Sequence, residues 1–169
     1  MNDISMVELE KHLRLKARKE EIHKLEAFVE KVCDQFNIYH SYFGNILFSV
    51  SEAFEFAISE KGDRLKYIDV YFESRPHGLV FKVSLSDRFL EIAALFQDDV
   101  DKALEAEEIS DSERSMVMIR MLSDEVNFDA KTELMEMVFY ITSINQHLTR
   151  ERIRLLDEYF EKINIKKPA

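Results

Sequence analysis

The apolar residues in the first third of the chain recur at three- and four-residue steps, which is the spacing of an amphipathic helix. One such run extends from Glu20 to Phe36 and a second from Ser41 to Ser59. Both runs therefore predict helices with one buried face. Residues 9–15, just before them, alternate apolar with charged or polar side chains, which is compatible with a first strand or with part of a longer helix.

The middle of the chain has the composition of strands. The runs Tyr67–Phe72 and Leu79–Leu85 are rich in β-branched and aromatic residues, and the segment from Arg75 to Gly78 between them contains Pro76. Two strand-like runs joined by a short segment with proline and glycine predict a β-hairpin.

The C-terminal half predicts a helix, a strand and a final helix. These elements span Ser115–Leu122, Glu133–Thr142 and Thr149–Ile163. The strand is expected to place four apolar side chains on one face, namely Met135, Met137, Phe139 and Ile141, and the final helix carries an apolar stripe of Ile153, Leu156, Tyr159, Phe160 and Ile163. The complete order of helix, helix, hairpin, helix, strand and helix predicts an α+β sandwich.

Composition narrows the classes of partner. The chain has 169 residues, so one domain is expected, and its net charge of −10 disfavours nucleic acid and anionic membranes as partners. It has no apolar run long enough for a transmembrane helix and no signal-peptide core near its start, which predicts a cytoplasmic protein. The single cysteine, Cys33, excludes an internal disulfide and lies on a helical face, where a buried thiol is expected.

Three segments resemble one known family. Ile46 to Ala53 resembles the helix that opens the nucleotide site of histidine-kinase-type ATPases. Met118 to Val126 resembles the helix of that family that ends in a leucine, small or apolar, aspartate, glutamate, valine phrase, and Lys131 to Met137 resembles the entry to its last strand. Together with the leading helices and the hairpin, their order is similar to that of the anti-sigma factor serine kinases, a branch of the histidine-kinase-like ATPase (GHKL) superfamily, over about residues 9 to 145.

This resemblance implies a fold in more detail. The family fold is a two-layer α/β sandwich with a mixed, mostly antiparallel sheet and helices on one face. Residues 1–145 would form this ATPase-like domain. Residues 146–169 would add an extra C-terminal helix packed on the same domain.

The family's catalytic positions are altered at the second helix. By the resemblance, Glu52 occupies the position of the general base that activates an attacking hydroxyl, and it would be catalytic only if the site is active. The magnesium-binding asparagine is replaced by Phe56, which cannot ligate a hard cation. We therefore expect no metal site, with Phe56 packed in the core or filling the pocket and Glu52 as an ordinary helix glutamate.

The nucleotide-binding positions are altered as well. The position of the aspartate that reads adenine falls on Leu85, or on Asp87 after a two-residue shift. Arg114–Met118 replaces the glycines that cradle phosphates, where Arg114 would contact a phosphate or simply lie exposed at a helix start. Thr132 keeps the family's residue type near the adenine.

Glycine content and charge also disfavour ATP at these positions. The chain has three glycines, Gly44, Gly62 and Gly78, and none falls in a phosphate-binding segment. The segment from Asp98 to Glu113, where the family has its ATP lid, holds eight carboxylates and one lysine. Such a segment repels a polyphosphate, although a solvated acidic helix over about residues 99–108 explains it equally well. We expect no cofactor, with ATP and magnesium bound only if the site is unexpectedly functional.

Three functions follow from this reading. The favoured one is a non-catalytic regulatory protein, or pseudokinase, that binds a sigma factor or an anti-anti-sigma protein in bacterial signalling or transcription control. The second is a divergent but active ATP-dependent serine kinase that uses another oxygen ligand, such as Glu52, Glu55 or Ser59. The third is an oligomeric scaffold, for example a homodimer, that pairs through the apolar stripe of the final helix.

Overall fold

The computed structural model describes residues 11–38, 40–59, 66–85, 92–94, 96, 105, 108, 110–141 and 154–162. The labelled elements follow one another along the chain as β1 (His12–Lys16), the 3-10 turn η1 (Lys19–Glu21), α1 (Ile22–Gln35), α2 (His40–Ser59), β2 (Tyr67–Arg75), β3 (Gly78–Ser84), α5 (Asp111–Leu122), β4 (Glu125–Asp129) and β5 (Leu134–Tyr140). Residues 154–162 form a further helix.

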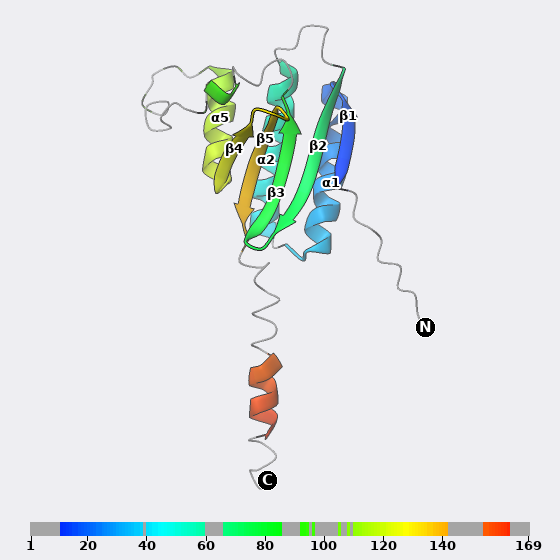
Figure 1. The fold of residues 1–169 in the computed structure, drawn as a ribbon, viewed down its shortest axis with the longest axis vertical. Helices are drawn as coiled ribbons and strands as arrows, with labels where there is room; N and C mark the ends of the chain where they lie inside the picture. The colour runs from blue at the N-terminus through cyan, green and yellow to red at the C-terminus, as the bar shows by residue number, and fades with distance from the viewer. Residues whose placement is uncertain are drawn as a thin grey trace, which may run out of the picture.

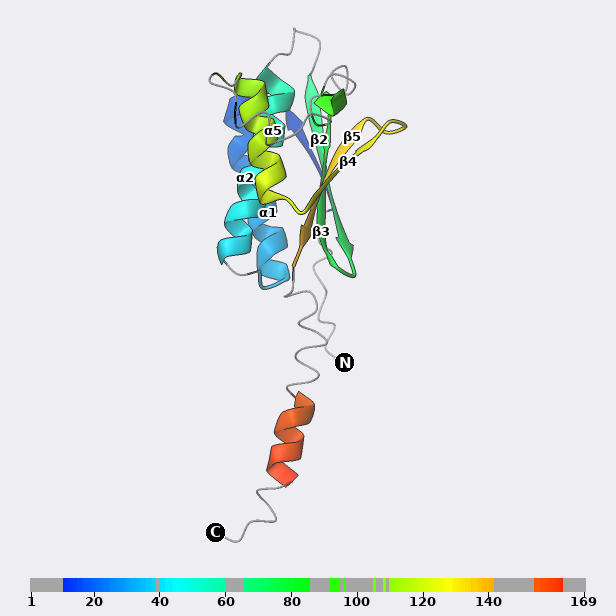
Figure 2. The ribbon, with the colours of Figure 1, turned by 90° about the vertical axis from the view of Figure 1, so that its left-hand side faces the viewer.

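The described strands form one five-stranded sheet in the order β1-β2-β3-β5-β4. Every neighbouring pair is antiparallel. The helices α1, α2 and α5 lie together against one face of this sheet, and the opposite face carries no labelled helix (Figures 1 and 2). The expected α+β sandwich of two layers, with helices on one face, is therefore confirmed at this level. The expectation of a mixed sheet is corrected, because every pairing among the described strands is antiparallel.

The core lies between the two layers. Strand β3 is its centre, because Leu79, Phe81 and Val83 point to the helices and are fully buried. The ring of Phe81 contacts three other rings, with centroid distances of 5.5 Å to Phe72 and 6.3 Å to both Phe28 and Phe139. Distances in this range favour edge and tilted aromatic packing. The four residues expected on one face of β5 and just after it are all buried, as predicted: Met135, Met137, Phe139 and Ile141.

The chain leaves α1 through a tight reversal. Asn37 has a φ of 52°, the left-handed conformation that commonly follows a helix end. The N–H of Ile38 donates to the Cys33 carbonyl at 2.9 Å and the N–H of Asn37 donates to the Asp34 carbonyl at 3.2 Å. These two bonds form a Schellman motif, which satisfies the last carbonyls of α1 and turns the chain toward α2.

Several expected boundaries are corrected by the structure. Residues 12–16 are a strand and not part of a longer helix. In the hairpin, Arg75 and Gly78 still pair with each other, so only Pro76 and His77 form the turn. The expected last strand begins at Leu134, and the sequence reading did not predict β4 at all.

The third predicted helix begins four residues earlier than expected, at Asp111 instead of Ser115. The reason is a helix cap, because the side chain of Ser110 accepts a hydrogen bond from the N–H of Glu113 at 3.2 Å. The Arg114–Met118 segment therefore lies inside the helix.

The helix at residues 154–162 is exposed along its whole length. Four of its large apolar side chains are more than half exposed, namely Leu155, Leu156, Tyr159 and Phe160. Packing of this segment on the domain, and its pairing with a second copy, stay predictions. No helix among the described residues is long and apolar enough to cross a bilayer.

Gly78 provides a test of the β3–β5 contact. A β-carbon at this buried position would collide with the backbone carbonyl oxygen of Phe139 in the neighbouring strand. We expect Gly78→Ala to lower the free energy of unfolding by about 1–3 kcal/mol, the usual cost of overpacking. Urea denaturation followed by circular dichroism measures this change.

Gly44→Ala is the matched control. A β-carbon at Gly44 meets nothing within 4 Å, and the residue lies inside α2. Alanine should therefore stabilise the protein by about 0.5–1 kcal/mol. Equal effects of the two substitutions would contradict the described packing of β3 against β5.

Candidate functional site

The residue at the expected general-base position contacts the third helix of the helical layer. Glu52 lies on α2 and accepts a hydrogen bond from the hydroxyl of Ser115 on α5, with an oxygen–oxygen distance of 2.9 Å. The pair is partly buried between two helices that lie side by side (Figures 1 and 2). The Glu52 carboxylate is therefore used to join α2 to α5.

Phe56 lies one helical turn beyond Glu52, on the same side of α2. Its side chain is only 5% exposed and belongs to the hydrophobic core. The expectation that Phe56 is packed in the core is confirmed. A buried phenyl ring thus occupies the position where the family's fold would place an oxygen ligand for magnesium.

The first turn of α5 is unfavourable for an anion because of its cap and its acidic side chains. Ser110 caps the helix, and Asp111 and Glu113 lie in the first turn, where carboxylates interact favourably with the helix dipole. The same negative charges would repel a phosphate. Arg114 is exposed, and its N–H donates to the Ser110 carbonyl at 2.9 Å as part of the helix.

Thr132 lies in the turn between β4 and β5. Its side chain is exposed and bonds to the carboxylate of Asp129, which also accepts the N–H of Lys131 at 2.9 Å. The backbone N–H of Lys131, followed by the hydroxyl of Thr132, lowers the pKa of Asp129. Thr132 therefore stabilises a hairpin turn. Asp87 lies outside the described residues, as does most of the acidic segment.

These residues do not fit magnesium and ATP. Of the positions that the resemblance implies, the one for the metal ligand holds the buried ring of Phe56, the one for the general base holds Glu52, which is bonded to Ser115, and the one for phosphates is a capped acidic helix turn. Within the described ranges, no group of three His, Cys, Asp or Glu side chains lies close enough to hold a metal ion.

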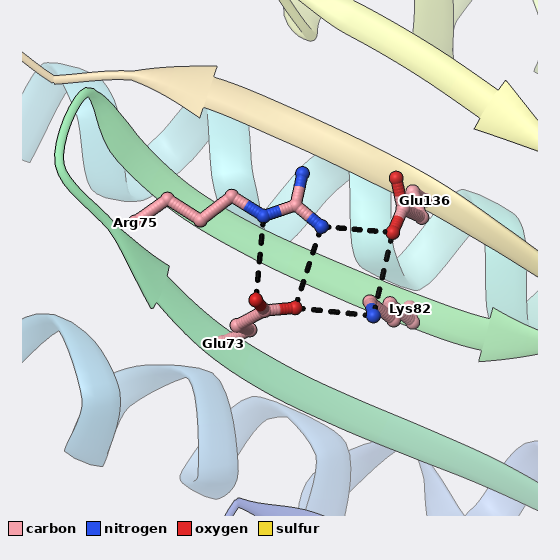
Figure 3. Close-up of polar contacts among 4 residues, drawn as sticks. All are labelled: Glu73, Arg75, Lys82 and Glu136. Carbon is pink, nitrogen blue, oxygen red and sulfur yellow. Dashed lines mark hydrogen bonds and ion pairs between the residues drawn. The ribbon is translucent and has the colours of Figure 1, made fainter.

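A second polar cluster lies on the open face of the sheet. Figure 3 shows it as four side chains, Glu73 and Arg75 from β2, Lys82 from β3 and Glu136 from β5. Arg75 bonds to Glu73 at 3.4 Å and to Glu136 at 3.0 Å, while the Lys82 ammonium lies 3.1 Å from Glu73 and 3.3 Å from Glu136. Each cation therefore contacts both carboxylates, and the cluster ties three strands together.

The charges of this cluster shift one another's proton affinity. The hydrogen bond from Lys82, followed by the one from Arg75, lowers the pKa of Glu73. Partial burial alone would lower the pKa of Lys82, but the hydrogen bonds to Glu73 and Glu136 raise it. The cluster pairs two cations with two carboxylates, which suits it to hold strands together better than to bind a charged ligand.

Sequence reasoning missed both of these contacts for a physical reason. Ser115 and Glu52 are 63 residues apart, and Arg75 and Glu136 are 61 residues apart. Periodicity reports which face a side chain takes, but it does not report which helix or strand lies opposite. The alternation of polar residues in the hairpin indicated which side chains lie on the open face of the sheet. It did not identify the residues that they contact.

Comparison with known proteins adds no relative: no family model matches the sequence, and neither does any curated protein. The likeness to the anti-sigma factor serine kinases therefore stays a resemblance carried by the residues quoted above.

The contact between α2 and α5 can be tested by a double-mutant cycle. Ser115→Ala and Glu52→Gln should each lower the free energy of unfolding by about 1–2 kcal/mol, since each weakens a partly buried hydrogen bond to a charged acceptor. The double variant should cost less than the sum, and urea denaturation of the four proteins measures the coupling.

Glu55→Gln is the control for this cycle, because Glu55 is an exposed glutamate on the same helix. Its effect should stay within about 0.5 kcal/mol. Strictly additive effects of Ser115→Ala and Glu52→Gln would contradict the contact.

The cluster of Figure 3 predicts a pH dependence. Because the pKa of Glu73 is lowered from its usual 4.5, its stabilising contribution is complete above that pH and is lost as the pH falls through the lowered value. Glu73→Gln should therefore be less stable than the native protein near neutral pH, by less than about 1 kcal/mol because Glu73 is half exposed to solvent.

The difference between the two proteins should shrink and vanish in acid, where Glu73 is protonated. Urea denaturation at a series of pH values measures it, with Glu30→Gln, a substitution at an exposed position of α1, as the control. A difference that grows as the pH falls would refute the prediction.

Proposed function

We propose that this protein is a non-catalytic regulatory domain that acts by binding another protein. It resembles an anti-sigma factor serine kinase that has lost its phosphotransfer chemistry. The observation that carries the proposal is the burial of Phe56, at 5% exposure, where the family places its magnesium ligand. A core phenyl ring offers no oxygen to a hard cation.

Two further contacts support the loss of chemistry. The Glu52 carboxylate is already bonded to the Ser115 hydroxyl, so it joins two helices. The helix start that would receive phosphates is capped by Ser110 and flanked by acidic side chains. The family-like positions have thus become structural ones.

The proposed partner is a sigma factor or an anti-anti-sigma protein, by analogy with the family. The net charge of −10 agrees with a protein that meets a basic or apolar protein surface. On this proposal, binding regulates transcription or signalling in a bacterium without any nucleotide. The active-kinase alternative would need another oxygen ligand in place of the asparagine, such as Glu52, Glu55 or Ser59.

The test is calorimetric titration of the purified protein with ATP and with ADP, each in the presence of magnesium. We expect no saturable heat at high micromolar protein and no thermal stabilisation by either nucleotide, because ligand binding to the folded state would raise the melting temperature. Phe56→Ala serves as the companion variant. It empties the position without adding an oxygen, so it should bind nucleotide no better.

Magnesium-dependent binding that weakens in Glu52→Gln would overturn the proposal in favour of an active kinase. The positive arm measures affinity for candidate sigma factors and anti-anti-sigma proteins with and without magnesium and ATP. Equal affinity under the two conditions is expected, whereas binding that requires ATP would contradict the proposal.

A further inference from the structure

The first strand of this acidic protein is strongly basic. Residues 11–19 contain five Lys or Arg residues and one His, and no Asp or Glu, in a chain of net charge −10. All six of these side chains are exposed: Lys11, His12, Arg14, Lys16, Arg18 and Lys19. The strand β1 therefore forms a local positive surface at one end of the sheet.

Strand β1 lies at the edge of the sheet formed by the described strands, and its hydrogen bonds show which residues face outward. The N–H of Phe72 donates to the Lys11 carbonyl at 2.8 Å, and the N–H of Ala17 donates to the Lys66 carbonyl at 3.0 Å. Bonded and non-bonded pairs alternate along antiparallel strands. Residues 11, 13, 15 and 17 therefore bond to β2, and the backbone groups of residues 12, 14 and 16 point to the free edge.

The three residues whose backbone groups point to the free edge also carry basic side chains. His12, Arg14 and Lys16 alternate with the inward-facing Leu13 and Leu15, so their side chains share the open face of the sheet. The carbonyl of Lys16 accepts the N–H of Arg18 at 2.8 Å, which leaves the N–H of Lys16 and both backbone groups of His12 and Arg14 directed to the edge. The outward main-chain groups and the basic side chains of these three residues thus lie along the same edge of the sheet.

Neighbours on β2 hold two of the basic side chains in place. Asp69 contacts Nε2 of His12 at 2.8 Å and Nε of Arg14 at 2.9 Å, and the Arg14 bond, as the largest cause, lowers the pKa of Asp69. The His12 ring stacks on Tyr71 at a centroid distance of 4.5 Å, and the Arg14 guanidinium lies 5.6 Å from the centre of the Tyr67 ring. Side chains fixed before binding lose less entropy when a ligand arrives.

We infer that the free edge of β1 binds an extended acidic segment of a partner protein as an added strand. The inference rests on the proposed protein-binding function and names one surface for it. The local positive charge of residues 11–19 selects an acidic segment there, although the chain as a whole is acidic. Backbone bonds to residues 12, 14 and 16 provide affinity, as in other cases of strand addition. Carboxylates at every second position of the segment lie opposite His12, Arg14 and Lys16 on the open face and select the partner.

A second copy of the chain fits this edge less well. Pairing of β1 with another β1 places cations opposite cations, which is destabilising. The other possible pairing is between β1 and β4 of a second copy. The N–H of Leu85 donates to the Glu133 carbonyl, and the N–H of Ile141 donates to the His77 carbonyl. The odd-numbered residues at and beyond the ends of β5 therefore bond to the β3 side.

The even-numbered residues of β5 therefore bond to Glu125, Asn127 and Asp129, so the free edge of β4 is formed by Val126 and Phe128. Pairing with β1 would set these inward-facing apolar side chains opposite the cations.

The experiment uses the full chain and a fluorescent synthetic peptide of about eight residues, within the usual length of a strand. The peptide has glutamate at every second position and threonine between them. Fluorescence anisotropy measures its affinity, and amide hydrogen exchange by NMR follows the N–H groups of His12 and Arg14. Saturable binding is expected, with exchange of both amides slowed about tenfold at saturation.

Two controls separate strand addition from simple attraction of charges. A peptide with methylated backbone nitrogens at its glutamates keeps the charge but loses strand hydrogen bonds, so it should bind at least about fivefold more weakly. Lys16→Glu should weaken the unmodified peptide about fivefold, whereas Lys131→Glu, the same charge change at an exposed turn position far along the chain, should change it less than about twofold. Lys16→Glu leaves the bonds of Asp69 to His12 and Arg14 in place.

The inference is overturned by no saturable binding, by equal binding of the methylated peptide, or by equal effects of the two lysine substitutions. Tighter binding of a single-stranded oligonucleotide would reassign the edge to nucleic acid. Protection of the His12 and Arg14 amides that rises with protein concentration, without peptide, would reassign it to a second copy. Nucleotide binding is measured separately, so the proposed function and this surface can fail independently.

Discussion

The structure depends on one constraint, the two-residue period of an antiparallel sheet that has the helices α1, α2 and α5 on the same face. On the covered face, β3 contributes Leu79, Phe81 and Val83, all fully buried, and the other strands pack their apolar residues around them. On the open face the same strands carry charges that bond to one another. A slip of one residue in any strand would exchange these two sets, so burial of the inner face fixes the register of the whole sheet.

That register also determines what α2 can do. The helix lies against the sheet, and burial of one side of it leaves Glu52 at the boundary with α5 and Phe56 inside. In the family that the sequence resembles, these two positions would serve a nucleotide. Here one joins helices and the other fills the core. The positions at Arg114 and Thr132 likewise belong to a capped helix and a hairpin turn.

Local patterns in the sequence predicted those parts of the fold that local chemistry determines. The two leading helices, the hairpin and the buried face of β5 follow from runs of apolar residues at a fixed period. The start of α5 was misplaced because a single cap, Ser110, determines it, and β4 was missed because its five residues alternate too briefly to stand out.

The contacts of the candidate site lay beyond such reasoning. Whether Glu52 faces a nucleotide or a serine depends on how α2 packs against a helix more than sixty residues away. The sequence could identify the absence of an oxygen at Phe56, and this needed no knowledge of packing. It gave no indication that Asp69 would hold His12 and Arg14 along an open edge, because that contact joins two strands across the first helices.

The position of β5 between β3 and β4 has a consequence for the order in which the protein folds. Apart from β1, the sheet consists of two local hairpins, β2–β3 and β4–β5. Their shared boundary pairs residues that are about fifty or more positions apart in the chain. Short hairpins close quickly, whereas joining distant segments costs loop entropy and slows folding. The boundary between β3 and β5 should therefore form last among the strand pairings of these two hairpins. Glu136 of β5 forms ion pairs with Arg75 and Lys82, which belong to the other hairpin. The ionic cluster on the open face is therefore completed only when the two hairpins have joined.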